Sequence, residues 1–483
     1  MLGRQLAELL DGAPPGIGEA LDLVTGFDDG LVQGFARLGE ERVAALAALA
    51  GAVAATPLGE RAAEAAEKTA AGSVADTHLT ALAGGRAALL GAVHDALLAR
   101  LDAALGRTRA PWQKPPVPPE TATPTPVADN LRRGCRSWLH ELAITGWRGV
   151  DHDLVSAADQ TLQALLAEPG LRRLAVLLDG LAAELRALCP VGTMEHLPVR
   201  RWADLWSRGL LLSQAGGWPG APWSGVPVAA GACRVSGRLL PLGIDVHEHG
   251  TAVQVQVHGV LEPAGGAQPR LVRTSVAAAK VDSIVGPALW RLLGDCPVLL
   301  AALAGHRSLE VSDLPLLASG DLVWYDQQAC AGETADPFAS ARVQLAGALA
   351  PAVPPLDRHP VRIADPVLVE GYSVAVQDSP AAVTLELDGN RLPVDLDRLP
   401  SCGPLTPERV ASSSACVGLM RWDGGGWRLQ PLAVQATAKR RRLAVHNGDW
   451  ALGPADREVV KAEAKAGDAV AVLRERAGRL LRR

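Results

Sequence analysis

The chain has 483 residues, of which 48% are hydrophobic and 20% charged, with a formal net charge of -5. This length exceeds what one hydrophobic core usually serves, so we expect two or three domains. The acidic balance argues against a general nucleic-acid binder, which usually carries a basic excess or stripe. No uninterrupted apolar run of about 18 residues occurs, so no membrane-spanning helix is expected.

The first 110 residues are predicted to form an N-terminal helical domain. Apolar residues recur there at helical intervals, as Leu21, Val24 and Leu31 do, so that each helix has one face for the core. An alanine-rich stretch at 61–69 combines high helix propensity with small side chains. We therefore expect a helical array over residues 1–110.

A proline-rich stretch follows at residues 111–127. It holds seven prolines, and each of them fixes the φ angle and removes a backbone amide donor. Neither a helix nor a central strand tolerates this density of proline, so the stretch is predicted to be an extended, semi-rigid linker. A polyproline ligand for an aromatic groove is the second interpretation.

Residues 128–215 are predicted to form a bundle of four antiparallel helices. Leucines between Leu171 and Leu188 keep helical spacing, and short connections separate the helices. Trp202 and Trp206 lie one turn apart on the last helix. Because tryptophan side chains anchor many protein interfaces, these two residues are candidates for contact with a partner.

At Gly216 the pattern changes from helical to strand-like. Residues 216–454 contain short Val-rich runs in which apolar and polar residues alternate, as at 253–257, and this alternation indicates strands with one wet face. An apolar helical insertion is predicted near 281–305. A C-terminal helix is predicted over 455–483, with basic residues at the end that the helix dipole favours.

The predicted fold class is therefore α+β, with several domains and an antiparallel, β-rich C-terminal part. The proline-rich linker separates residues 1–110 from the second bundle, whereas only a short Gly-Trp-Pro-Gly hinge joins that bundle to the β-rich domain. We therefore expect the second bundle and the β-rich domain to form one unit. The N-terminal helices would then be a movable appendage.

An Asp-x-His-x-His segment is the best metal candidate in the sequence. In a strand, alternate residues point to the same face, so Asp245, His247 and His249 would converge, with His258 as a further ligand from the returning strand. Such nitrogen and oxygen donors suit zinc or another divalent transition ion, and no other cofactor is predicted. Gly250, however, marks a hairpin tip, where polar residues are expected without any metal.

Lys439, Arg440, Arg441 and Arg442 form the densest basic run of the chain. The run lies between two strand-like segments, so we expect it on a hairpin loop. Two interpretations stay open, a contact with nucleic acid or an acidic partner and a plain solvated turn. The negative net charge of the whole chain favours the solvated turn.

Recognisable catalytic motifs are absent from the sequence. It contains no GxSxG elbow, no GxxxxGK[ST] phosphate loop and no GxGxxG dinucleotide motif. Its seven cysteines are scattered without CxxC spacing, as expected of reduced thiols in the cytoplasm. The first residues also lack the apolar core of a signal peptide, so a cytoplasmic location is expected.

Two parts of the chain resemble a known group. The first reads GCRSWLHELAITGWRGVDHDLVSAADQTLQALLAEPGLRRLAVLLDGLAAELR and continues with LPVRRWADLWSRGLLL. The second runs from WDGGGWRLQPLAVQ through AVHNGDWALG to AKAGDAVAVLRERAGRLLR. These parts resemble actinobacterial proteins related to the SWIM zinc-finger family, although the CxC and CxH pairs of that finger are absent. The finger's zinc binding and nucleic-acid contacts are therefore not implied.

The resemblance implies a gene neighbourhood with a MoxR-type AAA ATPase and a von Willebrand A-domain protein, which are the expected partners. With no catalytic motif in the sequence, we predict a non-catalytic adaptor or scaffold component of an ATPase-centred bacterial system. A metal-dependent enzyme that uses Asp245, His247 and His249 is the alternative. A nucleic-acid-binding accessory protein is a third interpretation.

Overall fold

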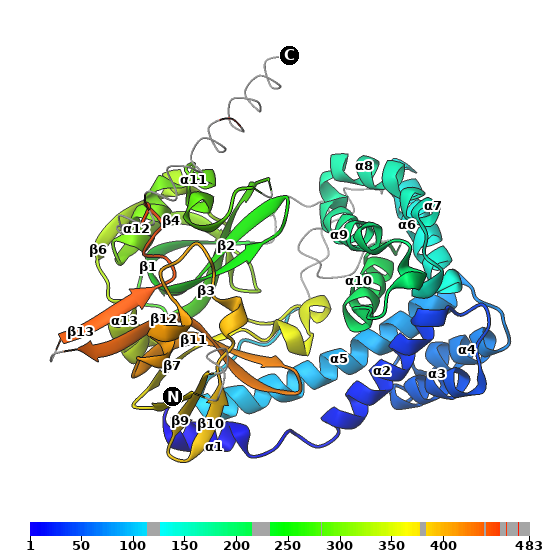
Figure 1. The fold of residues 1–483 in the computed structure, drawn as a ribbon, viewed down its shortest axis with the longest axis horizontal. Helices are drawn as coiled ribbons and strands as arrows, with labels where there is room; N and C mark the ends of the chain where they lie inside the picture. The colour runs from blue at the N-terminus through cyan, green and yellow to red at the C-terminus, as the bar shows by residue number, and fades with distance from the viewer. Residues whose placement is uncertain are drawn as a thin grey trace.

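The structure, a computed structural model, describes residues 1–113, 126–214, 232–281, 283–376, 383–438 and 441–454, together with Val460 and Val472. Helices dominate the first half of the chain and mostly antiparallel strands the second, so the predicted α+β fold class is confirmed. A helical lobe and a β lobe lie side by side, and α5 runs along both (Figure 1). The junction at Gly216 and most of the predicted linker and of the predicted C-terminal helix lie outside the described residues.

The helical lobe packs Leu-rich helix faces around buried aromatic rings. Its helices are α2 (Ile17–Gln33), α3 (Glu40–Ala52), α4 (Gly59–Ala70), the first part of α5 (Asp76–Leu105), α6 (Pro126–Thr145), α7 (His152–Ser156), α8 (Asp159–Ala167), α9 (Arg172–Leu188) and α10 (Val199–Leu212). In α9, Leu174, Leu178, Leu181 and Leu185 are all buried because their spacing places them on one face.

The first sheet of the β lobe closes on itself. Its strands are β1 (Cys233–Glu248), β2 (Ala252–Pro263), β3 (Arg270–Ala279), β4 (Arg307–Leu316), β5 (Asp321–Leu322) and β6 (Ala329–Thr334). The order is β1-β2-β3-β5-β4-β6, and β1 also pairs with β4, so the strands form a small barrel. The predicted insertion forms α11 (Leu289–Leu292) and α12 (Pro297–Ala304). Pro297 begins α12, a position where the missing amide costs nothing.

Two further sheets complete the β lobe. The four-stranded sheet contains β7 (Asp365–Glu370), β11 (Ala415–Asp423), β12 (Gly426–Ala438) and β13 (Arg441–His446), and the three-stranded sheet contains β8 (Ser373–Val376), β9 (Val383–Leu387) and β10 (Asn390–Pro393). Short helices α13 (Pro337–Gln344) and α14 (Pro407–Ala411) accompany them. Apolar residues of the barrel and the four-stranded sheet, such as Leu242 and Val417, share a core.

Short turns join several neighbouring strands of the β lobe into hairpins. β2 pairs with β3 in antiparallel register, and the Asp-Gly-Gly-Gly sequence closes β11 onto β12. Asp388 and Gly389, which join β9 to β10, have φ angles of 49° and 81°. Tight hairpin turns require such positive φ values, and this requirement explains the Asp-Gly pair.

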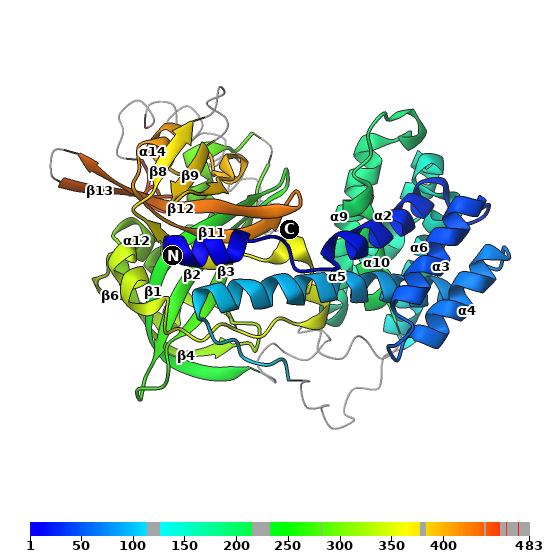
Figure 2. The same ribbon diagram turned by 90° about the horizontal axis from the view of Figure 1, so that it is seen from below.

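Helix α5 belongs to both lobes. Its first part supplies Leu79 and Leu82 to the helical core, and its last part supplies Leu97 and Leu101 to a core of the β lobe. Figure 2 shows α5 running from one lobe to the other. Helix α1 (Gly3–Leu10) also packs into that core of the β lobe. The first 110 residues therefore contact both parts of the molecule.

This packing differs from the predicted division of the chain. Phe27 and Leu31, from the predicted N-terminal domain, share one core with Trp206 and Leu210 from the predicted second bundle. The rings of Phe27 and Trp206 are 6.3 Å apart between centroids. The N-terminal helices are not an appendage here, because their apolar faces are buried against α10 and so removed from water.

A short segment of the β lobe also reaches the helical lobe. We refer to residues 353–363 as the clamp segment. It contains η7 (Pro355–Asp357) and η8 (Pro360–Arg362). Leu356 enters the helical core, and Asp357 accepts a hydrogen bond from Arg173 of α9 at 2.8 Å. The two lobes are thus joined by apolar and charged contacts as well as by α5.

Two further features concern the chain as a whole. None of the described helices is both long enough and apolar enough to cross a membrane. All seven cysteines fall within the described residues, and each is a free thiol. Cys135, Cys402 and Cys416 are buried, whereas Cys233 and Cys330 are exposed.

Candidate functional site

The predicted metal ligand Asp245 lies in a buried ion pair. Its side chain, on β1, points to the interface between the barrel and the four-stranded sheet. Arg421 of β11 donates to one carboxylate oxygen at 2.8 Å, and Gln430 of β12 donates to the other at 2.7 Å. Burial alone would raise the pKa of Asp245, but the hydrogen bond and charge of His247, followed by the charge of Arg421, lower it well below the usual range. Both carboxylate oxygens are therefore already engaged.

The three residues of the Asp-x-His-x-His segment do not form a ligand set. His247 lies 3.2 Å from Asp245, but His249 falls beyond the end of β1 and is exposed. Its backbone amide closes the turn onto Ala252 at 2.8 Å. The strand alternation that would align the residues ends before His249, so the prediction of convergence is corrected.

His258 also lies away from His249, the exposed end of the Asp-x-His-x-His segment. It lies on β2 opposite Gly243 and is almost completely buried. Burial and the charge of Arg273 lower its pKa from 6.5 to about 3, so the folded protein holds a neutral ring. Its Nε2 atom has no hydrogen-bond partner. His258 is a core residue between charged neighbours.

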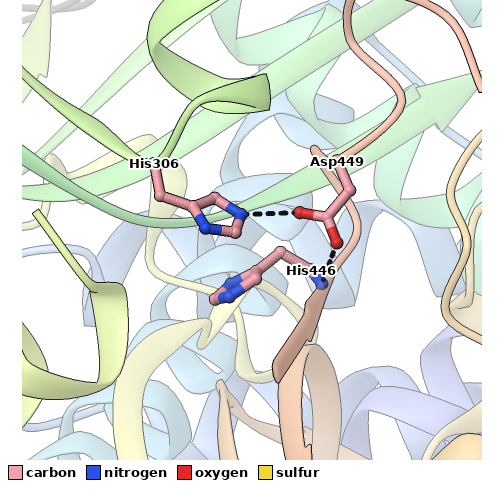
Figure 3. Close-up of side chains that lie close together, drawn as sticks. All are labelled: His306, His446 and Asp449. Atoms are coloured by element: carbon pink, nitrogen blue, oxygen red, sulfur yellow. Dashed lines mark hydrogen bonds and ion pairs between the residues drawn. The ribbon is translucent and has the colours of Figure 1, made fainter. Parts of the chain in front are cut away.

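A different cluster brings three candidate ligands together (Figure 3). His306 follows α12, His446 is the last residue of β13, and Asp449 lies in the turn that follows it. His306 Nε2 and an Asp449 carboxylate oxygen are 2.7 Å apart, and the two histidine rings are in tilted contact, with centroids 4.2 Å apart and an interplanar angle of 55°. The other oxygen of Asp449 accepts a hydrogen bond from the His446 backbone amide at 3.0 Å. This cluster is the candidate functional site.

The electrostatics differ between the two histidines. The hydrogen bond with Asp449 raises the pKa of His306. Burial and the charge of His306 lower the pKa of His446 from 6.5 to about 4. The edge of Phe338 packs on the His446 ring with centroids 5.7 Å apart. His446 is therefore a neutral imidazole near neutral pH, the form that binds metal ions.

Little in the amino-acid sequence indicates this cluster. His446 and Asp449 are three residues apart in a turn, a weak pattern that many solvated turns share. His306 is 143 residues away from Asp449 along the chain. Only the fold, which lays the end of α12 against the end of β13, brings His306 to the other two residues.

The predicted interaction residues Trp202 and Trp206 are completely buried. Trp206 donates to the backbone oxygen of Leu139 at 2.8 Å. Trp202 donates to Glu184 at 3.1 Å and meets Trp147 edge to face. These tryptophans hold α10 against α6 and α9, so the expectation that they contact a partner is corrected.

The basic run falls only partly within the described residues. Lys439 and Arg440 lie outside them, whereas Arg441 and Arg442 begin β13. Ala438 and Arg441 are antiparallel partners, as the predicted hairpin requires. Arg442 is exposed.

A cavity of about 210 Å³ lies between α1, α13 and β7. Leu105, Leu345 and Val367 supply apolar walls, and Arg342 and Glu370 supply charge. Arg342 donates twice to one Glu370 oxygen, at 2.7 and 3.0 Å. Because these two charges neutralise each other, this cavity is a weaker candidate than the histidine cluster.

Comparisons with known proteins do not assign the chain to a family. No protein-family model matches it, and no curated protein matches it. A solved structure described as "Structural mimicry for functional antagonism" aligns with 45% of this chain and 97% of its own, at 9% identity and a TM-score of 0.19. A likeness at that TM-score carries no argument about fold or function.

Proposed function

We propose that this protein is a non-catalytic scaffold or adaptor in an ATPase-centred bacterial system. Its partners would be a MoxR-type AAA ATPase and a von Willebrand A-domain protein, as the sequence resemblance implies. A scaffold of this kind has to hold two binding surfaces at a fixed separation and orientation. The arrangement of the two lobes supports this requirement.

The observation that carries the proposal is that the single helix α5 packs into the cores of both lobes. The helix has 30 residues, which corresponds to a length of about 45 Å. Its buried residues recur every three or four positions and enter the cores of both lobes. A hinge between the lobes would have to break this helix or expose one of its apolar ends to water, and both changes are unfavourable.

The clamp segment adds a second connection. One carboxylate oxygen of Asp357 lies close to three guanidinium groups. The nitrogen–oxygen distances are 2.8 Å to Arg173, 3.6 Å to Arg208 and 3.2 Å to Arg362. On α5, Asp95 pairs with Arg358 of the clamp segment at 2.9 Å. Charge pairs at this partly buried boundary favour one docking geometry, because a rotated lobe would leave several arginines without an anion.

Co-purification from the native host tests the proposal. The full chain, tagged and expressed at its normal level, should retain the MoxR-type ATPase or the von Willebrand A-domain protein at near-stoichiometric amounts. Recovery of neither protein would contradict the proposal.

Two variants make this experiment specific. Asp357→Asn should weaken capture, because it removes the shared anion at the lobe boundary. Glu386→Gln removes a partner of the exposed residue Arg391, far from that boundary, and should leave capture unchanged. Equal loss in both variants would indicate a nonspecific effect and count against a fixed lobe geometry.

A further inference from the structure

The cluster of His306, His446 and Asp449 has the donor chemistry of a metal centre. One ligand atom from each residue lies within 4.8 Å of the other two. Two imidazole nitrogens and one carboxylate oxygen form a set that zinc accepts, usually with water as a fourth ligand. The residues come from the connection after α12 and from the end of β13 and the turn after it, so the fold rather than local sequence assembles the set.

The buried imidazole of His446 is a second, independent observation that points to a ligand. The residue is 4% exposed, and neither Nδ1 nor Nε2 has a hydrogen-bond partner. Leaving a buried polar group unsatisfied is unfavourable, and native proteins rarely do so. Its ring lies next to that of His306, as Figure 3 shows, so the two unpartnered nitrogens belong to the same cluster.

The surroundings leave room for one small ligand. A cavity of about 20 Å³ is lined by His306 and His446, together with Gly243 and Pro337. That volume accommodates about one water-sized group. The His306 and Asp449 side chains are 34% and 25% exposed, so an ion can reach the cluster from solvent.

We propose that His306, His446 and Asp449 bind one zinc ion. Ligand atoms around a tetrahedral zinc lie about 3.4 Å apart, given bonds of about 2.0–2.1 Å. The 2.7 Å contact between His306 and Asp449 therefore opens by about 0.7 Å as the ion replaces the hydrogen shared by the two groups. The ion also satisfies one nitrogen of His446 and ties the end of α12 to the end of β13.

Zinc titration of the chelator-stripped full chain tests this site. The wild-type protein should bind one equivalent in competition with a chromogenic chelator. His446→Ala should weaken binding by at least about 100-fold, since loss of even an outer-shell partner costs about 10–100-fold. Asp449→Asn should weaken it as well.

The other histidine segment provides the matched controls. His247→Ala and His249→Ala should bind zinc as the wild type does. Loss of binding in these two variants, with binding retained in His446→Ala, would overturn the proposal in favour of the Asp245 segment. A folded wild-type protein that shows no saturable binding would also overturn it.

A second readout covers the case in which His446→Ala fails to fold. Cobalt in place of zinc should give visible d–d absorption with the wild type, and Asp449→Asn, altered at a partly exposed position, should reduce that absorption. An unchanged spectrum in a folded Asp449→Asn protein would contradict the assignment. These outcomes are independent of partner capture, so the site and the scaffold function can fail separately.

Discussion

The helical lobe and the β lobe bury charge in different ways. In the helical lobe, Arg86 on α5 pairs with Asp28 on α2 at 2.6 Å and lies 3.7 Å from Asp204 on α10. Asp204 in turn lies 3.7 Å from His359 of the clamp segment, so this network extends to the lobe boundary. In the β lobe, the Asp245–Arg421 pair is enclosed between two sheets.

The difference shows what each buried charge does. A network with several alternative partners can tolerate the loss of one member and can connect separate parts of a molecule. Among the described residues, Arg421 forms an ion pair with no carboxylate other than Asp245, so this pair fixes the register of the two sheets that it joins. Charge burial thus couples lobes in one region and sheets in the other.

The largest loss of stability is expected when the ion pair between Asp245 and Arg421 is broken. Asp245→Ala leaves Arg421 buried without an anion, and we expect a loss of about 3–5 kcal/mol in the free energy of unfolding. Chemical denaturation followed by circular dichroism measures this. The triple variant Asp245→Leu/Arg421→Met/Gln430→Leu, which also removes the buried amide bonded to both charged groups, should recover most of the loss, and a triple variant as unstable as Asp245→Ala would contradict this account.

The corresponding change in the helical lobe should be milder. Asp28→Asn removes the main partner of Arg86, which is 1% exposed, but Asp204 remains close by. We expect a loss of about 2–3 kcal/mol, typical of a weakened buried polar contact. A loss larger than that of Asp245→Ala in the same denaturation series would reverse the comparison between the lobes.

Acid should destabilise the β lobe through His258. Its pKa is about 3 when folded and 6.5 ordinarily, so below pH 6.5 the unfolded chain takes up a proton that the folded protein does not. Stability is therefore complete above that pH and falls as the pH decreases toward 3. Between about pH 7 and pH 5 the expected loss is about 2 kcal/mol.

Unfolding measured at both pH values isolates this contribution. The charges facing His258 are those of Arg273, Arg421, Asp245 and Asp365. His258→Gln should reduce the pH dependence by about 2 kcal/mol, whereas the exposed control His249→Gln should retain the wild-type dependence. An unchanged slope in His258→Gln would show that other groups cause the acid sensitivity.

The smallest effect on stability is expected at the clamp segment. The Asp357 side chain is 25% exposed and its partner Arg173 is 15% exposed, so Asp357→Asn should cost about 1 kcal/mol. Thermal unfolding measures this cost. A loss as large as that of Asp28→Asn would mean that the clamp segment contributes to the core rather than to docking alone.

Much of the secondary structure followed from the sequence. Strand alternation at 253–257 and the helical insertion near 281–305 depend on local spacing, which a sequence displays directly. Helix α5 was harder to interpret, because the sequence does not show which neighbours cover its apolar face. The core that the helices before and after the proline-rich linker share was therefore not predicted.

Which residues form a site depends even more on tertiary structure than the secondary structure does. Asp245 and His247 have the spacing of a metal site, yet Arg421, far along the chain, supplies the partner that neutralises Asp245. Trp202 and Trp206 have the residue type of interface anchors, but α6 and α9 cover them. The histidine cluster required His306 and His446 to meet across two segments that share no local pattern.

A distance measurement between the lobes tests the central claim of a rigid two-lobed scaffold most directly. Spin labels at the exposed positions Val176 of α9 and Val343 of α13, each changed to cysteine, report the separation of the lobes once the exposed and partly exposed thiols of Cys189, Cys233, Cys296 and Cys330 are replaced by serine. The account predicts one narrow distance distribution in the otherwise unaltered chain and a broader one with Asp357→Asn. A broad or multiple distribution without that substitution would contradict it.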